Sequence, residues 1–116
     1  MCVGCSAGHA SDALILYGEA VKFERARDHK MRDLHLAKFF GQIREAEEQN
    51  PFPETREQIR GIRKTVESTV ASNSPLPDIA DKLTAKAAEI IGQLREHPEL
   101  CRSCSLPKTV PEVEHV

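Results

Sequence analysis

The four cysteines form the strongest chemical pattern in this sequence of 116 residues. They make two Cys-x-x-Cys pairs, Cys2 with Cys5 and Cys101 with Cys104. This spacing lets two thiolates reach one ion across a tight turn, and the small residue Gly4 suits such a turn. Four thiolates around Zn²⁺ complete a tetrahedral structural site with no open position. We therefore expect all four cysteines to bind one metal ion, with zinc as the default.

Other chemistries fit the same cysteines. Soft thiolates also hold an iron–sulfur cluster, which would make the protein an electron-transfer or redox-sensing subunit. A metal-free thiol switch is a third interpretation. His9 follows Cys5 by four residues and is placed to replace one thiolate or to hydrogen-bond to a metal-bound sulfur. A polar residue near a helix cap is the simpler interpretation of His9, because four cysteines already complete the shell.

The distance between the pairs along the sequence is unusual for zinc. Between Cys5 and Cys101 lie 95 residues, whereas compact zinc modules separate their pairs by about 15–20. The ion would therefore join the two ends of one domain. Closing a loop of this size costs about 4–5 kcal/mol of chain entropy. Zinc binding supplies about 10–16 kcal/mol in favourable cases, which offsets that cost.

No recognised catalytic motif accompanies the cysteines. The sequence contains no His-Glu-x-x-His, no phosphate-binding loop and no dinucleotide-binding glycine pattern. One segment gathers polar side chains, namely Asp28, His29, Arg32, Asp33 and His35. A solvated helix face explains that segment without chemistry. We therefore expect a protein that is not an enzyme.

A short basic row raises the question of nucleic-acid binding. Four cations occupy adjacent positions of one predicted helix: Arg56, Arg60, Arg63 and Lys64. Such a row can follow phosphates. Three carboxylates share that helix, namely Glu54, Glu57 and Glu67. The whole chain also carries a net charge of −2, so the sequence favours a solvated face with i,i+3 and i,i+4 ion pairs and keeps nucleic-acid binding as an alternative.

The spacing of apolar residues predicts an all-α fold with four helices, over about 11–27, 30–49, 54–73 and 75–97. Ser11 or Asp12 is expected to cap the first helix, and Thr55 with Gln58 has the spacing of a capping box. Ser74 is expected to cap the last helix, with Pro75 in its first position. Residues 1–104 would form the metal-linked bundle, and residues 105–116 an extended tail.

The first break in the helical pattern decides the topology. If Asp28 marks a turn, four helices make an up-down bundle, and the chain returns to the end where it began. Both cysteine pairs then meet at one metal site. If residues 11–49 form one helix, three passes leave the pairs far apart, and the metal would be shared between two chains of a homodimer.

The composition is that of an ordinary globular domain, with 40% hydrophobic and 29% charged residues. No apolar run approaches the length of a membrane span, and the first residues lack the pattern of a secretory signal, so we expect a cytoplasmic protein. We expect it to act on another protein as an accessory, adaptor or inhibitor.

Overall fold

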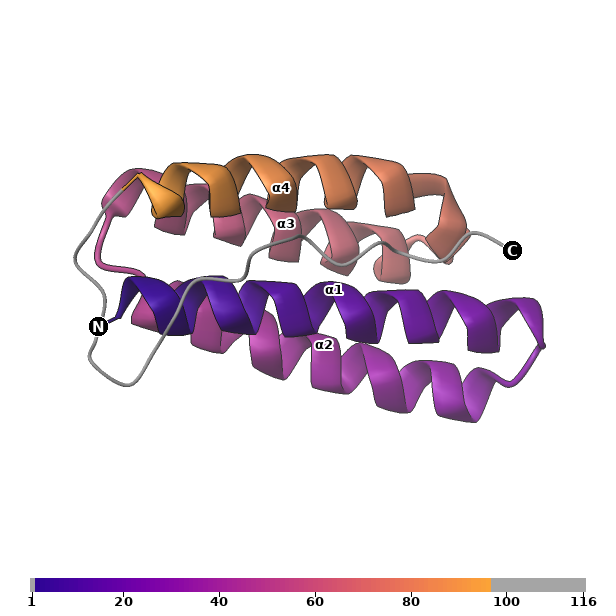
Figure 1. The fold of residues 1–116 in the computed structure, drawn as a ribbon. Coiled ribbons are helices and arrows are strands. Elements are labelled where there is room, and N and C mark those ends of the chain that lie inside the picture. The colour runs from indigo at the N-terminus through magenta and orange to yellow at the C-terminus, as the bar shows by residue number, and fades with distance from the viewer. Residues whose placement is uncertain (1, 97–116) are drawn as a thin grey trace.

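The computed structural model describes residues 2–96. Within this range the chain forms α1 (Val3–Arg25), α2 (His29–Gln49), α3 (Pro53–Ala71), the short 3₁₀ helix η1 (Leu76–Ile79) and α4 (Ala80–Arg95). The four long helices run alternately up and down the bundle (Figure 1). The prediction of four helices is confirmed, and the alternative of one helix over 11–49 is wrong. Cys101, Cys104 and the predicted tail lie outside the described residues.

Each helix packs against two others, because α1 contacts α2 and α4, and α3 contacts the same two helices. We call the end where α1 begins and α4 ends the cysteine end, and the opposite end the turn end (Figure 1). The α2–α3 connection lies at the cysteine end. The α1–α2 turn and the α3–η1 connection lie at the turn end.

The first helix begins earlier than predicted. It starts at Val3 rather than near Ser11, with Cys2 as its N-cap residue. No proline interrupts residues 3–10, and Val3, Ala7 and Ala10 are buried on the inner face of α1. The burial of this extra length stabilises the helix where the sequence has little periodic signal. The first cysteine pair therefore lies on the first turn of a helix and not in a separate tight turn.

The turn between α1 and α2 forms where the apolar pattern is interrupted. Arg27 adopts a positive φ of 58°, and the side chain of Asp28 accepts a hydrogen bond from the backbone N–H of Met31 at 3.2 Å. Asp28 is therefore the N-cap of α2. Its short carboxylate satisfies a backbone donor at the start of α2, which is the reason for the break at this position.

The capping box predicted for the third helix is wrong, because α3 starts at Pro53 with Phe52 as its N-cap. The side chain of the fully buried Asn50 organises this connection instead. Its Oδ1 accepts hydrogen bonds from the backbone N–H of Phe52 and from the hydroxyl of Thr55, both at 2.8 Å. Asn50, which lies outside the helix, therefore orders the start of α3 in place of a Thr55–Gln58 capping box.

The predicted cap of the last helix is also wrong. Ser74 lies 2.8 Å from the hydroxyl of Ser72, and the chain first forms η1 before α4 begins at Ala80. The main chain of Leu76 is held by α1, because its carbonyl accepts a hydrogen bond from the Tyr17 hydroxyl at 2.5 Å and its N–H donates to Glu24 at 2.8 Å. These long-range hydrogen bonds, and not a cap by Ser74, therefore fix the connection between α3 and α4.

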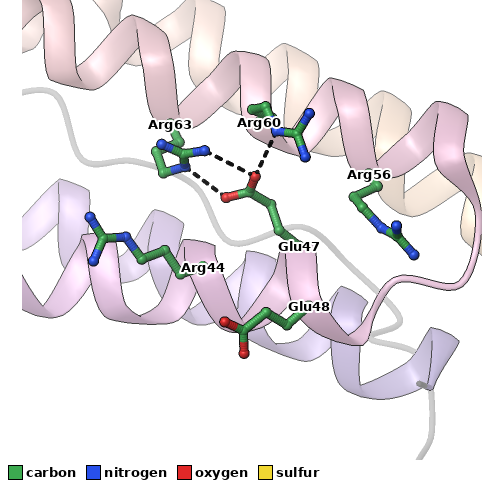
Figure 2. A pocket seen from close by; sticks show the side chains of 6 residues that line it. All are labelled: Arg44, Glu47, Glu48, Arg56, Arg60 and Arg63. Atoms are coloured by element: carbon green, nitrogen blue, oxygen red, sulfur yellow. Dashed lines mark hydrogen bonds and ion pairs between the residues drawn. The ribbon is translucent and has the colours of Figure 1, made fainter.

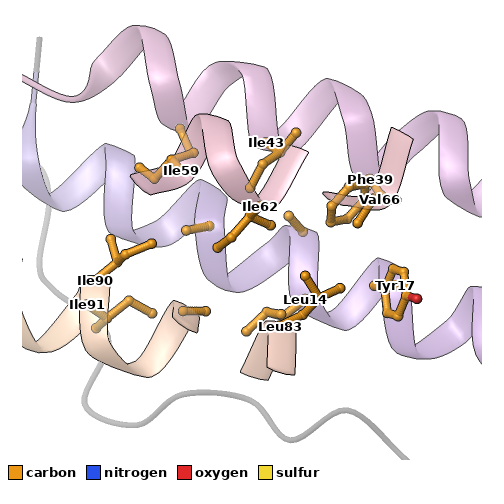
Figure 3. Packing of buried hydrophobic residues seen from close by; sticks show 14 of the residues in the cluster. Leu14, Tyr17, Phe39, Ile43, Ile59, Ile62, Val66, Leu83, Ile90 and Ile91 are labelled. Atoms are coloured by element: carbon orange, nitrogen blue, oxygen red, sulfur yellow. The ribbon is translucent and has the colours of Figure 1, made fainter. Parts of the chain in front are cut away.

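The core runs along the bundle between all four helices (Figure 3). The apolar spacing of the last two helices predicts a buried face, and its members Ile59, Ile62 and Val66 of α3 and Leu83, Ile90 and Leu94 of α4 are buried. Val70, at the end of the α3 row, is exposed. On α1 many buried residues are small, among them Ala7, Ala10, Ala13 and Ala20. Small side chains let α1 and α2 approach closely, and this pair has the most extensive contact in the bundle. Among residues 2–96, none of the helices has the length and apolarity needed to cross a membrane.

Candidate functional site

The first cysteine pair lies at the start of α1, with its backbone anchored to α2. The N–H of Cys2 donates to the carbonyl of Gln49 at 2.7 Å, and the nearby Ser6 hydroxyl donates to the carbonyl of Ala46 at 2.7 Å. Cys2 is 7% exposed, whereas Cys5 is only partly buried. The pair therefore occupies a fixed position beside the last turn of α2.

Cys2 acts as the cap of its own helix through sulfur. Its Sγ accepts a hydrogen bond from the backbone N–H of Cys5 at 3.3 Å. The positive end of the α1 dipole lies at the same place, and both effects favour negative charge on the sulfur. A thiolate is the form of cysteine that binds metals. The local geometry is therefore compatible with the chemistry predicted for this pair.

The second pair follows the end of α4 in the sequence. α4 ends at Arg95 at the cysteine end of the bundle, and Cys101 and Cys104 come shortly after it, outside the described residues (Figure 1). Within residues 2–96 no three His, Cys, Asp or Glu side chains are grouped to hold a metal ion. The site with four thiolates thus stays a prediction.

His9 lies on α1 one turn beyond Cys5 and is partly buried. Its Nδ1 is 2.6 Å from the side-chain oxygen of Gln42 on α2. Because an amide oxygen accepts hydrogen bonds, Nδ1 carries the proton in this contact. His9 therefore helps to join α1 to α2, and its predicted contact with a metal-bound sulfur is not tested by the described residues.

The basic row of α3 faces α2, and one carboxylate organises it. Glu47 of α2 is buried, and its two oxygens accept hydrogen bonds from Arg63 at 2.7 and 3.2 Å and from Arg60 at 3.3 Å (Figure 2). The bonds to Glu47 raise the pKa of the Arg63 guanidinium above its ordinary value. Glu47 therefore binds α3 to α2 through two guanidinium groups.

Arg56 and Lys64, the other two cations of the row, have different surroundings. Arg56 donates from Nε and Nη2 to the carbonyl of Asn50, at 3.1 and 2.7 Å, which fastens it to the α2–α3 connection. Lys64 is exposed. The predicted ion pairs within the helix are present, because Arg60 contacts Glu57 and Arg63 contacts Glu67, both at 2.8 Å.

Sequence reasoning missed Glu47, although a signal existed. Glu47 follows Ile43 by four residues and adjoins Ala46, both of which are buried on α2. A carboxylate that continues an apolar face has to find a partner, because an unpaired buried charge is costly. The three arginines of α3 are potential partners. Which of them lies opposite Glu47 depends on how α3 packs against α2, and the sequence does not show this.

The same side chains line an open cleft between α2 and α3, with a volume of about 460 Å³. Its lining consists of six residues: Arg44, Glu47, Glu48, Arg56, Arg60 and Arg63. Figure 2 shows Glu47 in the middle of the cleft, with Arg44 on one side of it and Arg56 on the other. The cleft therefore distributes its positive charges along its length.

The polar segment singled out between residues 28 and 35 is a helix face with ion pairs. Arg32 lies 2.9 Å from Asp33 and 3.5 Å from Glu24. His35 lies 3.0 Å from Glu19 of α1 through Nε2 and 2.8 Å from the carbonyl of Met31 through Nδ1. The contacts with Glu24 and Glu19 join α2 to α1, and the other two lie within α2, so the segment is part of the helix packing.

The chain was also compared with known proteins. No family of proteins, no curated protein and no solved structure matches it.

Proposed function

We propose that this protein is a helical bundle closed by one zinc ion, and that it acts on another protein as an accessory, adaptor or inhibitor. Cys2, Cys5, Cys101 and Cys104 would supply the four thiolates. A closed thiolate shell leaves no position for a substrate, so the ion would stabilise the fold. The exposed helical surface would then carry the function.

The observation that carries this proposal is the return of the chain to its starting end. α1 begins and α4 ends at the cysteine end of the bundle (Figure 1). Only four residues lie between Glu96, the last described residue, and Cys101. An extended chain covers about 3.3–3.6 Å per residue, so this segment is long enough to reach from the end of α4 to the neighbouring helix α1.

The geometry of Cys2 and Cys5 also supports the proposed metal site. Cys2 and Cys5 lie on one helical turn, and the Cys2 sulfur already accepts an N–H bond. Backbone N–H bonds to ligand sulfurs orient thiolates and stabilise their charge in metal sites. Two of the four ligands would therefore already be in position before Cys101 and Cys104 bind the ion.

The direct experiment is metal analysis of the chain purified under anaerobic, reducing conditions. We expect a colourless protein that holds one zinc ion per chain and runs as a monomer. A brown protein with visible absorption would show that the iron–sulfur alternative is correct and zinc is wrong. A protein without metal would contradict the metal site and favour the thiol switch.

The oligomeric state shows whether the ligands of the metal ion come from one chain or from two. One zinc ion per monomer agrees with closure within a single chain. A metal-dependent dimer that dissociates on addition of a chelator would show instead that the ligands come from two chains, and the closure proposed here would be wrong.

A further inference from the structure

We propose that the cleft between α2 and α3 binds an acidic polypeptide segment of the partner protein. This inference names the chemistry of the partner and rests on the proposed role in protein binding. The surface consists of Arg44, Arg56, Arg60 and Arg63 around the buried Glu47, with Glu48 at the margin. We call it the arginine cleft.

The charge of the arginine cleft is opposite to that of the chain. Four arginines and two glutamates line it, which leaves two positive charges in excess, whereas the whole chain carries a net charge of −2. A local positive potential on an acidic protein attracts negative groups to that surface. The cleft is therefore a part of the described surface where an acidic partner would be favoured.

Glu47 prepares the cleft by fixing two of the guanidinium groups. It holds Nε and Nη2 of Arg63 and Nε of Arg60, and its own side chain is only 10% exposed. The side chains of Arg60 and Arg63 therefore lose less conformational entropy when a ligand binds. A pre-ordered guanidinium group that keeps one N–H group open is suited to bind a further carboxylate.

Donors remain after these internal bonds are counted. Among residues 2–96, the Nη2 group of Arg60 has no acceptor, and Arg44 is exposed with neither an ion pair nor a side-chain hydrogen bond. Figure 2 shows these two side chains on different helices and directed to different parts of the cleft. They could each bind a separate carboxylate.

The spread of the charges favours a polypeptide over a single anion. Arg44 and Arg56 lie on opposite sides of Glu47 (Figure 2), so a ligand with several negative groups can contact more of the guanidinium groups than a single phosphate or carboxylate. A chain with acidic side chains at intervals can meet one guanidinium after another.

The intervening carboxylates disfavour a nucleic acid. Glu47 lies within the row of arginines, and Glu57 and Glu67 flank it through their pairs with Arg60 and Arg63. A continuous run of phosphates would pass over these negative groups. An acidic peptide can place its own uncharged residues there.

The test measures binding of a labelled peptide in which glutamates alternate with serines to the full chain as purified, at low and at physiological salt, with a single-stranded oligonucleotide of equal charge as the competing probe. We expect saturable peptide binding that weakens with salt, and weaker binding of the oligonucleotide. Arg44→Gln and Arg60→Gln should each reduce peptide affinity about twofold to fivefold, as expected for exposed charge pairs.

Lys64→Gln is the matched control, because Lys64 is an exposed cation of α3 that does not line the cleft. It should leave the peptide affinity unchanged. Equal effects of all three substitutions would show nonspecific attraction and overturn the proposal. Tighter binding of the oligonucleotide, lost in Arg44→Gln, would overturn it in favour of a nucleic-acid surface.

Zinc content measured on the same samples separates the two proposals. A zinc-loaded chain that fails to bind the peptide would contradict the arginine cleft alone. If a metal-free chain bound the peptide in an Arg44-dependent manner, the metal site would be wrong while the acidic partner remained supported.

Discussion

The turn end and the cysteine end of the bundle hold their helices together by different means. At the turn end, Tyr17 and Glu24 of α1 hold the main chain of Leu76 between α3 and α4 by two hydrogen bonds. At the cysteine end, α1 is bonded to α2 through the N–H of Cys2, and α2 is bonded to α3 through Glu47. We expect thiolates and a metal to join α1 to the segment after α4 at this end.

The difference shows two solutions to one entropic problem. At the turn end, the hydrogen bonds to Leu76 also join distant residues, 59 and 52 positions apart, but there the packed core already closes the loop and the hydrogen bonds only fix the connection. The two cysteine pairs are separated by almost the whole chain, and a link between them closes a loop of about 100 residues at a cost of about 4–5 kcal/mol. A strong link such as a metal–thiolate site offsets that cost, whereas a single hydrogen bond contributes only about 1 kcal/mol.

The largest expected effect comes from breaking the proposed metal link. Cys101→Ser removes one ligand, and we expect a loss of several kcal/mol in the free energy of unfolding, since the folded chain loses much of a metal-binding free energy of about 10–16 kcal/mol. Chemical denaturation and zinc content would measure the loss. Treatment of the unsubstituted protein with a chelator should reproduce it, and an unchanged stability would refute a structural metal.

A smaller loss is expected from the ion pairs next to the cysteine end. Glu47→Ala leaves two guanidinium groups without their carboxylate and should cost about 2–3 kcal/mol, less than a fully buried pair because Arg60 and Arg63 are partly exposed. Glu57→Ala, which removes an exposed partner of Arg60, is the control and should cost less than about 1 kcal/mol. Equal losses in the two variants would mean that Glu47 contributes no more than a surface charge.

At the turn end we expect a loss of about 1–2 kcal/mol for Tyr17→Phe. This substitution keeps the buried ring and leaves the carbonyl of Leu76 without its donor. Denaturation at neutral pH would measure the change. A neutral effect would show that the hydroxyl does not hold the connection.

Tyr17 also predicts how stability depends on alkaline pH. Burial, followed by the charges of Glu24 and Asp78, raises the pKa of Tyr17 above its ordinary value. The unfolded chain then loses this proton at lower pH than the folded chain, so the contribution is present below the ordinary tyrosine pKa and is lost as the pH rises from there. Tyr17 is the sole tyrosine, so tyrosinate absorbance follows it directly, and Tyr17→Phe should flatten this alkaline decline.

The smallest effect is expected from the α1–α2 turn. Arg27 has a φ of 58°, a conformation that costs an ordinary residue about 1–2 kcal/mol and glycine almost nothing. Arg27→Gly should therefore raise stability by about 0.5–1 kcal/mol after the added entropy of the unfolded chain is subtracted. Arg25→Gly, inside the last turn of α1, should lower it by a similar amount. A loss in both variants would mean that the Arg27 side chain stabilises the turn.

The sequence by itself determined the elements whose signals are local. Asp28, the prolines near residue 52 and the segment around Asn73 separate four helices, and regular apolar spacing identified the buried faces of α3 and α4. These features depend on backbone geometry and on residues within one or two turns of each other, which a linear pattern records.

Only the tertiary structure decided the features that join distant residues. The early start of α1, the role of Asn50 in place of a capping box, the bonds from Tyr17 and Glu24 to Leu76, and the pairing of Glu47 with Arg60 and Arg63 all require knowledge of which helices touch and in what register. A charged or polar side chain has many potential partners along the sequence. Its actual partner is selected when the apolar faces pack and bring one of them within hydrogen-bonding distance.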